Sequence, residues 1–73
     1  MNYLSFYTET RLSLRQVEVI GLIADGLSSA EIGEKLCMSK RTAEGIRAEL
    51  LIKTGANNSA ALVAFAFRNG IIK

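Results

Sequence analysis

The side chains best suited to chemistry in this sequence are basic and hydroxyl groups between residues 40 and 53. Lysine, arginine and threonine bind phosphate oxygens through charge and hydrogen bonds. The candidates are Lys40, Arg41, Thr42, Arg47 and Lys53. Such a group predicts contacts with a polyanion, and we expect the partner to be double-stranded DNA.

Other kinds of chemistry need residues that the sequence lacks. The chain of 73 residues has no histidine and a single cysteine, Cys37. A zinc site, a catalytic triad or a thiol–imidazole pair therefore cannot be built within one chain. We expect no catalytic residues, no metal and no cofactor, so the protein is not expected to be an enzyme. Cys37 is expected to fill space in a turn.

The composition predicts one small helical domain. Hydrophobic residues make up 49% of the chain and charged residues 22%, and there is no proline. These values favour an ordered, all-α fold. No apolar stretch approaches the roughly 20 residues that span a membrane, and nothing resembles a signal peptide. We expect a cytoplasmic protein with no membrane attachment.

Charge is unevenly distributed along the chain, whose formal net charge is +2. Residues 1–34 carry two basic and five acidic side chains, a balance of −3. Residues 35–73 carry seven basic and two acidic side chains, a balance of +5. The basic part contains the phosphate-binding candidates, as a DNA-facing surface requires.

Two helices joined by a short turn are predicted to position those candidates. Ser28 and Glu31 fit a capping box that begins a helix over residues 29–36, and the next two residues form the turn. Ser39 is the expected N-cap of a longer helix from residue 40 to about residue 53, and Gly55 ends it. This order is the helix-turn-helix pattern, whose second helix enters the major groove of DNA.

The longer helix has two different faces. Ala43, Ile46 and Leu50 recur at three- and four-residue steps and should face the core. The opposite face presents Lys40, Arg41, Glu44, Gly45 and Ala48. Arg47 and Lys53 lie at the flanks, from which long side chains can reach phosphates.

A first helix is expected over residues 12–26, with Ser13 as the N-cap in a second capping box. Its apolar residues fall on one face and should form a wall of the core. Glu18 borders that face and would need a partner if covered. Arg47 or Lys53 could supply the opposite charge.

The last predicted helix runs from about residue 59 to residue 69 and is apolar on every side over residues 60–67, AALVAFAF. One packing surface in a small domain cannot cover such a helix. We expect one side to complete the core and the other to form a symmetric dimer. The expected dimer residues are Ala61, Ala64, Phe65 and Arg68. The alternative is that the aromatic N-terminal arm, residues 1–11, covers this side.

Taken together, these segments resemble the four-helix LuxR/GerE-type DNA-binding domain. The matching positions are Arg15, Glu18, Val19, Ala24, Gly26, Ser28, Glu31, Ile32, Leu36, Ser39, Thr42, Lys53, Gly55 and Gly70. The resemblance covers residues 12–72 and implies an all-α helix-turn-helix domain over residues 12–73, preceded by a short arm. It is similar to the stand-alone GerE subtype, so we expect no attached receiver or ligand-binding domain.

The departures from the family fall where bases should be contacted. The resemblance places base recognition at positions 44, 45 and 48, which here are Glu44, Gly45 and Ala48. Family members usually carry lysine in place of Glu44. Glycine offers no side chain, and alanine can contact only a thymine methyl group.

Two functions remain open at this point. In the first, the domain is a DNA-binding transcriptional regulator. Its specificity comes from Arg41 contacting guanine, from Glu44 accepting from cytosine N4, or from DNA shape. In the second, the same face of the helix binds a protein, and the domain is a co-regulator or an antagonist that has lost base recognition. A protein partner in the transcription machinery is possible in either case.

Overall fold

The computed structural model describes residues 11–73, and over this range the chain forms four α-helices and no strand. They are α2 (Leu14–Ala24), α3 (Ser29–Leu36), α4 (Lys40–Thr54) and α5 (Ser59–Arg68). The predicted all-α, four-helix class is confirmed. The alternative that the N-terminal arm covers α5 falls on residues 1–10, outside the described range.

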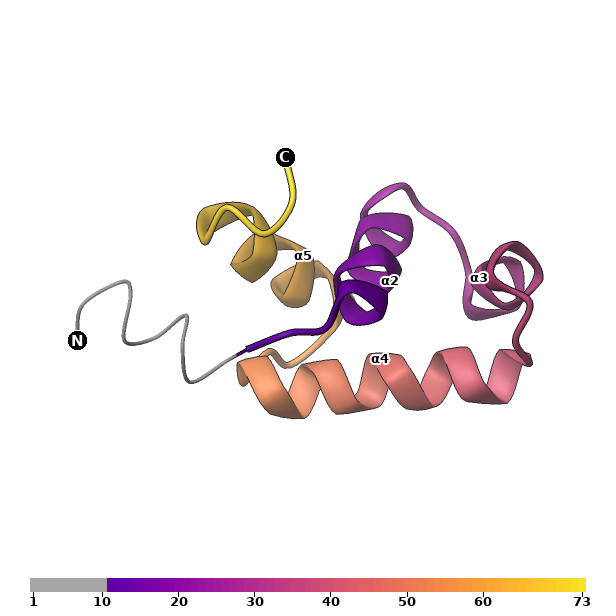
Figure 1. Cartoon of the computed structure of the whole chain (residues 1–73). Coiled ribbons are helices and arrows are strands. Elements are labelled where there is room, and N and C mark those ends of the chain that lie inside the picture. Colours follow the sequence, from indigo (N-terminus) through magenta and orange to yellow (C-terminus); the bar gives the residue numbers. More distant parts are fainter. Residues whose placement is uncertain (1–10) are drawn as a thin grey trace.

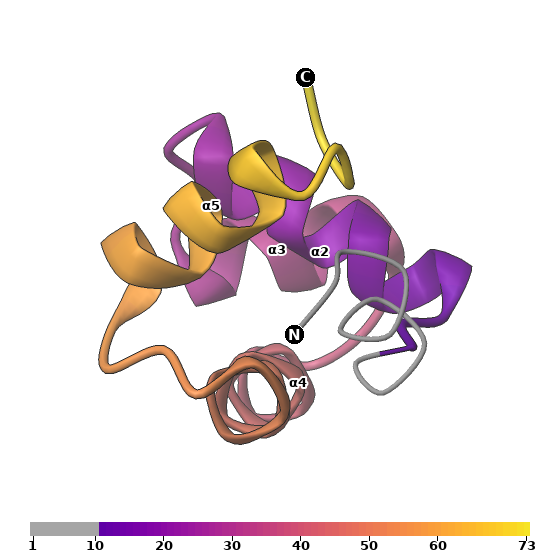
Figure 2. The ribbon, with the colours of Figure 1, turned by 90° about the vertical axis from the view of Figure 1, so that its left-hand side faces the viewer.

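The longest helix, α4, lies along one side of the molecule and the other three helices pack on its inner side (Figure 1). The view down the axis of α4 shows that its opposite side faces away from them (Figure 2). None of the helices in residues 11–73 is long and apolar enough alone to cross a membrane; only α4 and α5 together, bent by 58°, pass such a test by length and composition.

The core takes residues from all four helices. Ile20 of α2, Leu50 of α4 and Leu62 of α5 are fully buried, and Ile32 of α3 is 2% exposed. Val19, Ala43 and Ala66 complete the buried cluster. The predicted inner face of α4 is confirmed, since Ala43 and Leu50 are buried and Ile46 packs against them.

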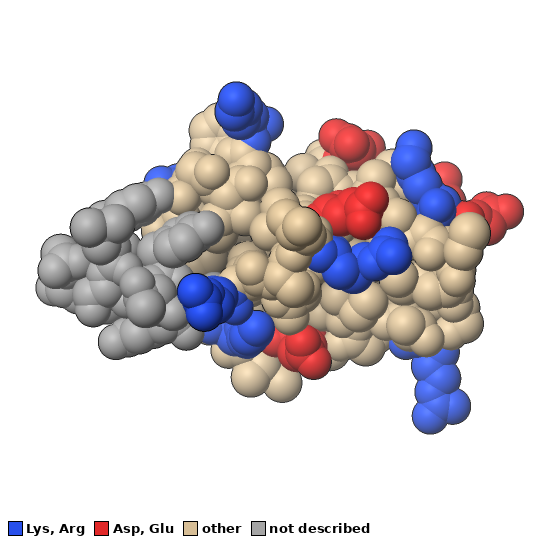
Figure 3. Space-filling view, viewed as in Figure 1, with Lys and Arg blue, Asp and Glu red and all other residues tan. Residues whose placement is uncertain are grey.

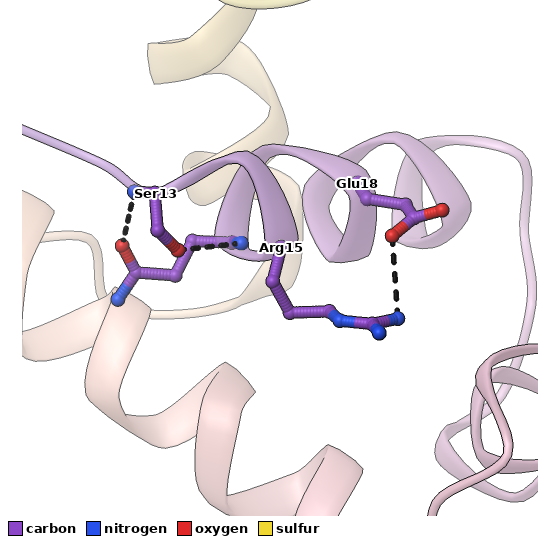
Figure 4. A network of polar contacts seen from close by, with 4 residues as sticks. Ser13, Arg15 and Glu18 are labelled. Carbon is purple, nitrogen blue, oxygen red and sulfur yellow. Dashed lines mark hydrogen bonds and ion pairs between the residues drawn. The ribbon is translucent and has the colours of Figure 1, made fainter.

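The predicted capping residues begin the helices. Ser13 Oγ accepts from the Gln16 backbone N–H over 3.1 Å, and Gln16 Oε1 accepts from the Ser13 N–H over 2.8 Å (Figure 4). Ser28 and Glu31 form the same reciprocal pair at α3. Asn58 caps α5. These local hydrogen bonds satisfy backbone donors that the first turn of a helix leaves unpaired.

Two expectations about single side chains are wrong. Glu18 lies on the surface and pairs with Arg15 of its own helix at 3.3 Å (Figure 4), instead of with Arg47 or Lys53. Residues three apart on a helix are neighbours, so no interhelical partner is needed. Cys37 is exposed and does not fill space. Its φ of 58° lets it end α3 in the left-handed conformation.

Candidate nucleic-acid interface

The turn between α3 and α4 depends on a close approach at Gly33. A Cβ on Gly33 would lie 2.5 Å from the Met38 carbonyl oxygen, closer than packed atoms allow. The Met38 N–H also donates to the Gly33 carbonyl over 2.9 Å. Sequence patterns did not single out Gly33, because the contact involves backbone on the far side of the turn. This close fit fixes the direction of α4 relative to α3.

Ser39 and Thr42 form the start of α4. Ser39 Oγ accepts from the Thr42 backbone N–H over 3.0 Å and donates its own hydrogen to Thr42 Oγ1 over 2.9 Å. These two bonds orient the Thr42 hydroxyl, whose hydrogen can donate to an outside acceptor. The first turn of α4 contains no acidic residue. Its positive helix end is therefore not neutralised by a carboxylate of its own.

The start of α3 is different in this respect. The Glu31 carboxylate accepts from the Ser28 backbone N–H over 2.9 Å. Hydrogen bonds from the backbone and then from the side chain of Ser28 hold the pKa of Glu31 below its usual value of 4.5. A negative group therefore already occupies the N-terminus of α3, whereas the first turn of α4, like those of α2 and α5, has no acidic residue and is open to an anion.

The predicted outward side of α4, here called the outer face, is exposed throughout. It consists of Lys40, Arg41, Glu44, Gly45 and Ala48. Within residues 11–73, its three charged side chains have no hydrogen-bond or ion-pair partner. A Cβ on Gly45 would meet nothing within 4 Å. The outer face is thus open, with long charged groups at its N-terminal end and small residues beside them.

Lys53 lies at the other end of α4, where its exposed side chain bonds to two other groups of the domain. Its Nζ donates to the Arg11 carbonyl oxygen over 2.9 Å and to Gln16 Oε1 over 3.4 Å. Gln16 Nε2 in turn donates to Glu49 Oε1 over 2.8 Å. We call Gln16, Glu49 and Lys53 the α2–α4 polar network. It fastens the end of α4 to the start of α2.

Arg47 also makes a contact within the domain that was not predicted from the sequence. Its side chain is half-buried, and Nη1 donates to Ser59 Oγ at the start of α5 over 3.2 Å. Arg47 and Ser59 line a cavity of about 310 Å³ that is also bordered by Ile23, Leu27 and Ile32. Of the five predicted phosphate-binding residues, Lys40, Arg41 and Thr42 therefore lie together at the open end of α4, while Arg47 and Lys53 tie α4 to neighbouring segments.

The surface separates charges only in part. In the space-filling view, most acidic side chains lie at the upper right, next to a basic one, and the lower edge, where α4 lies, carries both basic and acidic side chains (Figure 3). Residues 11–73 contain no group of three His, Cys, Asp or Glu residues that could hold a metal ion. The chemistry that this surface supports is the binding of anionic groups near the start of α4.

Comparison with known proteins places this arrangement in a family. Residues 10–66 match the family described as bacterial regulatory proteins, luxR family (GerE). The chain is 46% identical over 66 residues to the transcriptional activator protein BjaR1 of Bradyrhizobium diazoefficiens, covering 90% of this chain and 27% of that protein. It is 34% identical over 62 residues to the oxygen regulatory protein NreC of Staphylococcus aureus, covering 85% of this chain and 29% of that protein.

The chain thus spans less than a third of the length of either relative. No solved structure gives a significant match. The matched family is one of regulators and not of enzymes. Because the match covers most of its length, the chain belongs to the luxR family of bacterial regulatory proteins and is a DNA-binding helix-turn-helix domain of transcriptional regulators.

Proposed function

We propose that the domain regulates transcription by placing the N-terminal half of α4 in the major groove of double-stranded DNA. The observation that carries this proposal is the open start of α4, where Lys40 and Arg41 are exposed and have no partner among the described residues. An exposed helix with free cations and an unneutralised N-terminus suits a groove lined by phosphates.

The predicted DNA-binding residues divide into two roles in this proposal. Lys40 and Thr42 bind phosphates directly, and Arg41 can bind a phosphate or the edge of a guanine. Glu44, Gly45 and Ala48 face the base edges. Arg47 and Lys53 hold α4 at its angle, since each already bonds to another segment of the domain. Their remaining N–H groups can still donate to phosphates at the edge of the groove.

A titration with DNA tests this assignment. Fluorescence anisotropy with mixed duplex DNA, and with DNA from the promoter region of the chain's own gene, should show binding that weakens with salt. Lys40→Ala should reduce the slope of log affinity against log salt by about 0.9. Lys73→Ala, which removes the same charge at the C-terminal residue, is the matched control and should change the slope less.

Absence of binding to either DNA at low salt would contradict the proposal. It would favour the other function considered for this sequence, an interaction module whose outer face contacts a protein of the transcription machinery. In that case the same exposed residues would be expected to bind a protein surface.

We further propose that the domain acts as a dimer through α5. The apolar side of α5 is incompletely covered: Ala61, Ala64 and Phe65 are half-buried, and Arg68 is exposed. Phe67, which was not among the predicted interface residues, is 63% exposed. A second copy could bury this row by a two-fold contact that uses one surface twice.

Sedimentation velocity over a range of concentrations tests the dimer. Phe67→Ser should shift the protein towards monomer. Ile52→Ser is the control, because Ile52 is 83% exposed but lies on α4. A wild-type protein that is monomeric at every concentration would contradict the dimer and favour the alternative that the N-terminal arm covers α5.

A further inference from the structure

Glu44 is the only carboxylate on the outer face of α4. Its side chain is exposed and has no hydrogen-bond or ion-pair partner within residues 11–73, although Lys40 and Arg41 precede it by one turn. Glu49 of the same helix, in contrast, accepts from Gln16. The Glu44 carboxylate is therefore available to an outside donor.

A carboxylate that enters a DNA groove is repelled by phosphates and needs a donor in compensation. In the major groove, guanine and thymine present only acceptor atoms to it, N7 and O6 of guanine and O4 of thymine. Adenine offers its N6 amino group next to the acceptor N7. Cytosine offers its N4 amino group with no acceptor beside it on the same base. A carboxylate in this position therefore favours cytosine over the other three bases.

The neighbours of Glu44 support such a contact. Gly45 has no side chain and Ala48 only a methyl group, so neither residue projects far from the helix beside the carboxylate. A Cβ on Gly45 would still meet nothing within 4 Å. The helix can therefore approach the base edges closely. Arg41, three residues earlier, lies on the same side of the helix and can donate to O6 and N7 of a guanine. The two side chains together match the donor and acceptor pattern of a C·G pair.

Resting on the DNA binding proposed above, we propose that Glu44 is the specificity-determining residue of α4 and selects cytosine by accepting a hydrogen bond from its N4 amino group. The acidic residue thus narrows the choice of DNA site. It lowers affinity for most sequences and is compensated where a cytosine faces it.

The test begins with selection of binding sites from a random duplex library by the wild-type protein. Anisotropy titrations then compare the enriched duplex with its single-base variants. The wild type should prefer cytosine at one position by about tenfold. Glu44→Gln should move the preference at that position to adenine, because an amide both donates and accepts. Glu44→Ala should lose the preference there and leave it unchanged elsewhere.

Glu34→Gln is the matched control. Glu34 is exposed on α3, so this change removes the same charge without altering the outer face of α4. It should leave the base preference unchanged. If Glu34→Gln and Glu44→Gln raise affinity equally and keep the wild-type preference, Glu44 acts only through net charge and the inference is overturned. Circular dichroism should show the same helicity for all variants, since neither side chain supports another part of the domain.

Failure of the inference and failure of the proposed function give different results. A selected duplex whose base preferences survive Glu44→Ala overturns the role of Glu44 and leaves DNA binding in place. A library that yields no enriched sequence, together with no binding at low salt, overturns both.

Discussion

The two halves of α4 use charged residues in opposite ways. In the N-terminal half, Lys40, Arg41 and Glu44 are exposed and unpartnered among the described residues. In the C-terminal half, Glu49 and Lys53 belong to the α2–α4 polar network. The same residue types are therefore free of partners among the described residues at one end of the helix and bonded to α2 at the other. Charge and spacing in the sequence therefore do not show which of these side chains already has a partner within the domain.

The largest expected effect concerns the buried side of the C-terminal half of α4. Leu50→Ala should lower the free energy of unfolding by about 2–5 kcal/mol, because Leu50 is fully buried and truncation leaves a cavity. Ile52→Ala is the control on the same helix, since Ile52 is 83% exposed, and it should change stability by less than about 0.5 kcal/mol. Urea unfolding measures both. Equal effects would mean that α4 does not pack as described.

The next prediction compares two glutamates. Glu49→Ala should lower the free energy of unfolding by about 1 kcal/mol, because it removes the acceptor of Gln16 Nε2. Glu44→Ala should change it by less than about 0.5 kcal/mol. The measurement is again urea unfolding. A loss of stability in Glu44→Ala equal to that in Glu49→Ala would remove the distinction between the two halves.

Substitutions of Arg41 and Lys53, at opposite ends of α4, should have different effects on DNA affinity and on stability. Arg41→Ala should leave the urea midpoint unchanged and reduce the salt slope of DNA binding by about 0.9. Lys53→Ala should lower the urea midpoint, because Lys53 holds the Arg11 carbonyl oxygen and Gln16. Its effect on the salt slope should be smaller than that of Arg41→Ala. A larger effect of Lys53→Ala than of Arg41→Ala on the salt slope would indicate that the C-terminal end of α4 contacts DNA.

The smallest expected effect is a pH dependence at α3. The folded state lowers the pKa of Glu31 from 4.5, so the unfolded chain binds a proton more readily. The resulting stability is present above pH 4.5 and is lost as pH falls through the lower, folded pKa. Glu31→Gln should make the midpoint of thermal unfolding less dependent on pH across this range. Glu34→Gln, for which no such hydrogen bonds are seen, should retain the wild-type slope.

Features that depend on neighbouring residues could be predicted from the sequence. The capping boxes at Ser13 and Ser28, the N-cap Ser39 and the terminator Gly55 all involve residues within one turn of a helix end. The spacing of Ala43, Ile46 and Leu50 at three- and four-residue steps likewise predicts the buried side of α4. Hydrogen bonding at helix ends and burial of one face are local consequences of residue order.

Features that depend on how helices cross could not be predicted in this way. Lys53 and Gln16 are 37 residues apart, and Arg47 and Ser59 belong to different helices. Lys53 and Arg47 have the right chemistry for phosphate binding. Only the packing of α4 against α2 and α5 shows that both side chains already have partners. The same holds for Gly33, whose close neighbour lies across the turn, and for Phe67, whose exposure depends on the rotation of α5.

The isolation of the outer face of α4 also bears on how this domain can evolve. Because Lys40, Arg41, Glu44, Gly45 and Ala48 support no other part of residues 11–73, single substitutions there need no compensating change in the scaffold. Under the proposed function, a lineage carrying this domain could therefore acquire a new operator in few mutational steps while every intermediate still folds. The same property would make these five positions a practical target for libraries that aim to redirect the domain to chosen promoters.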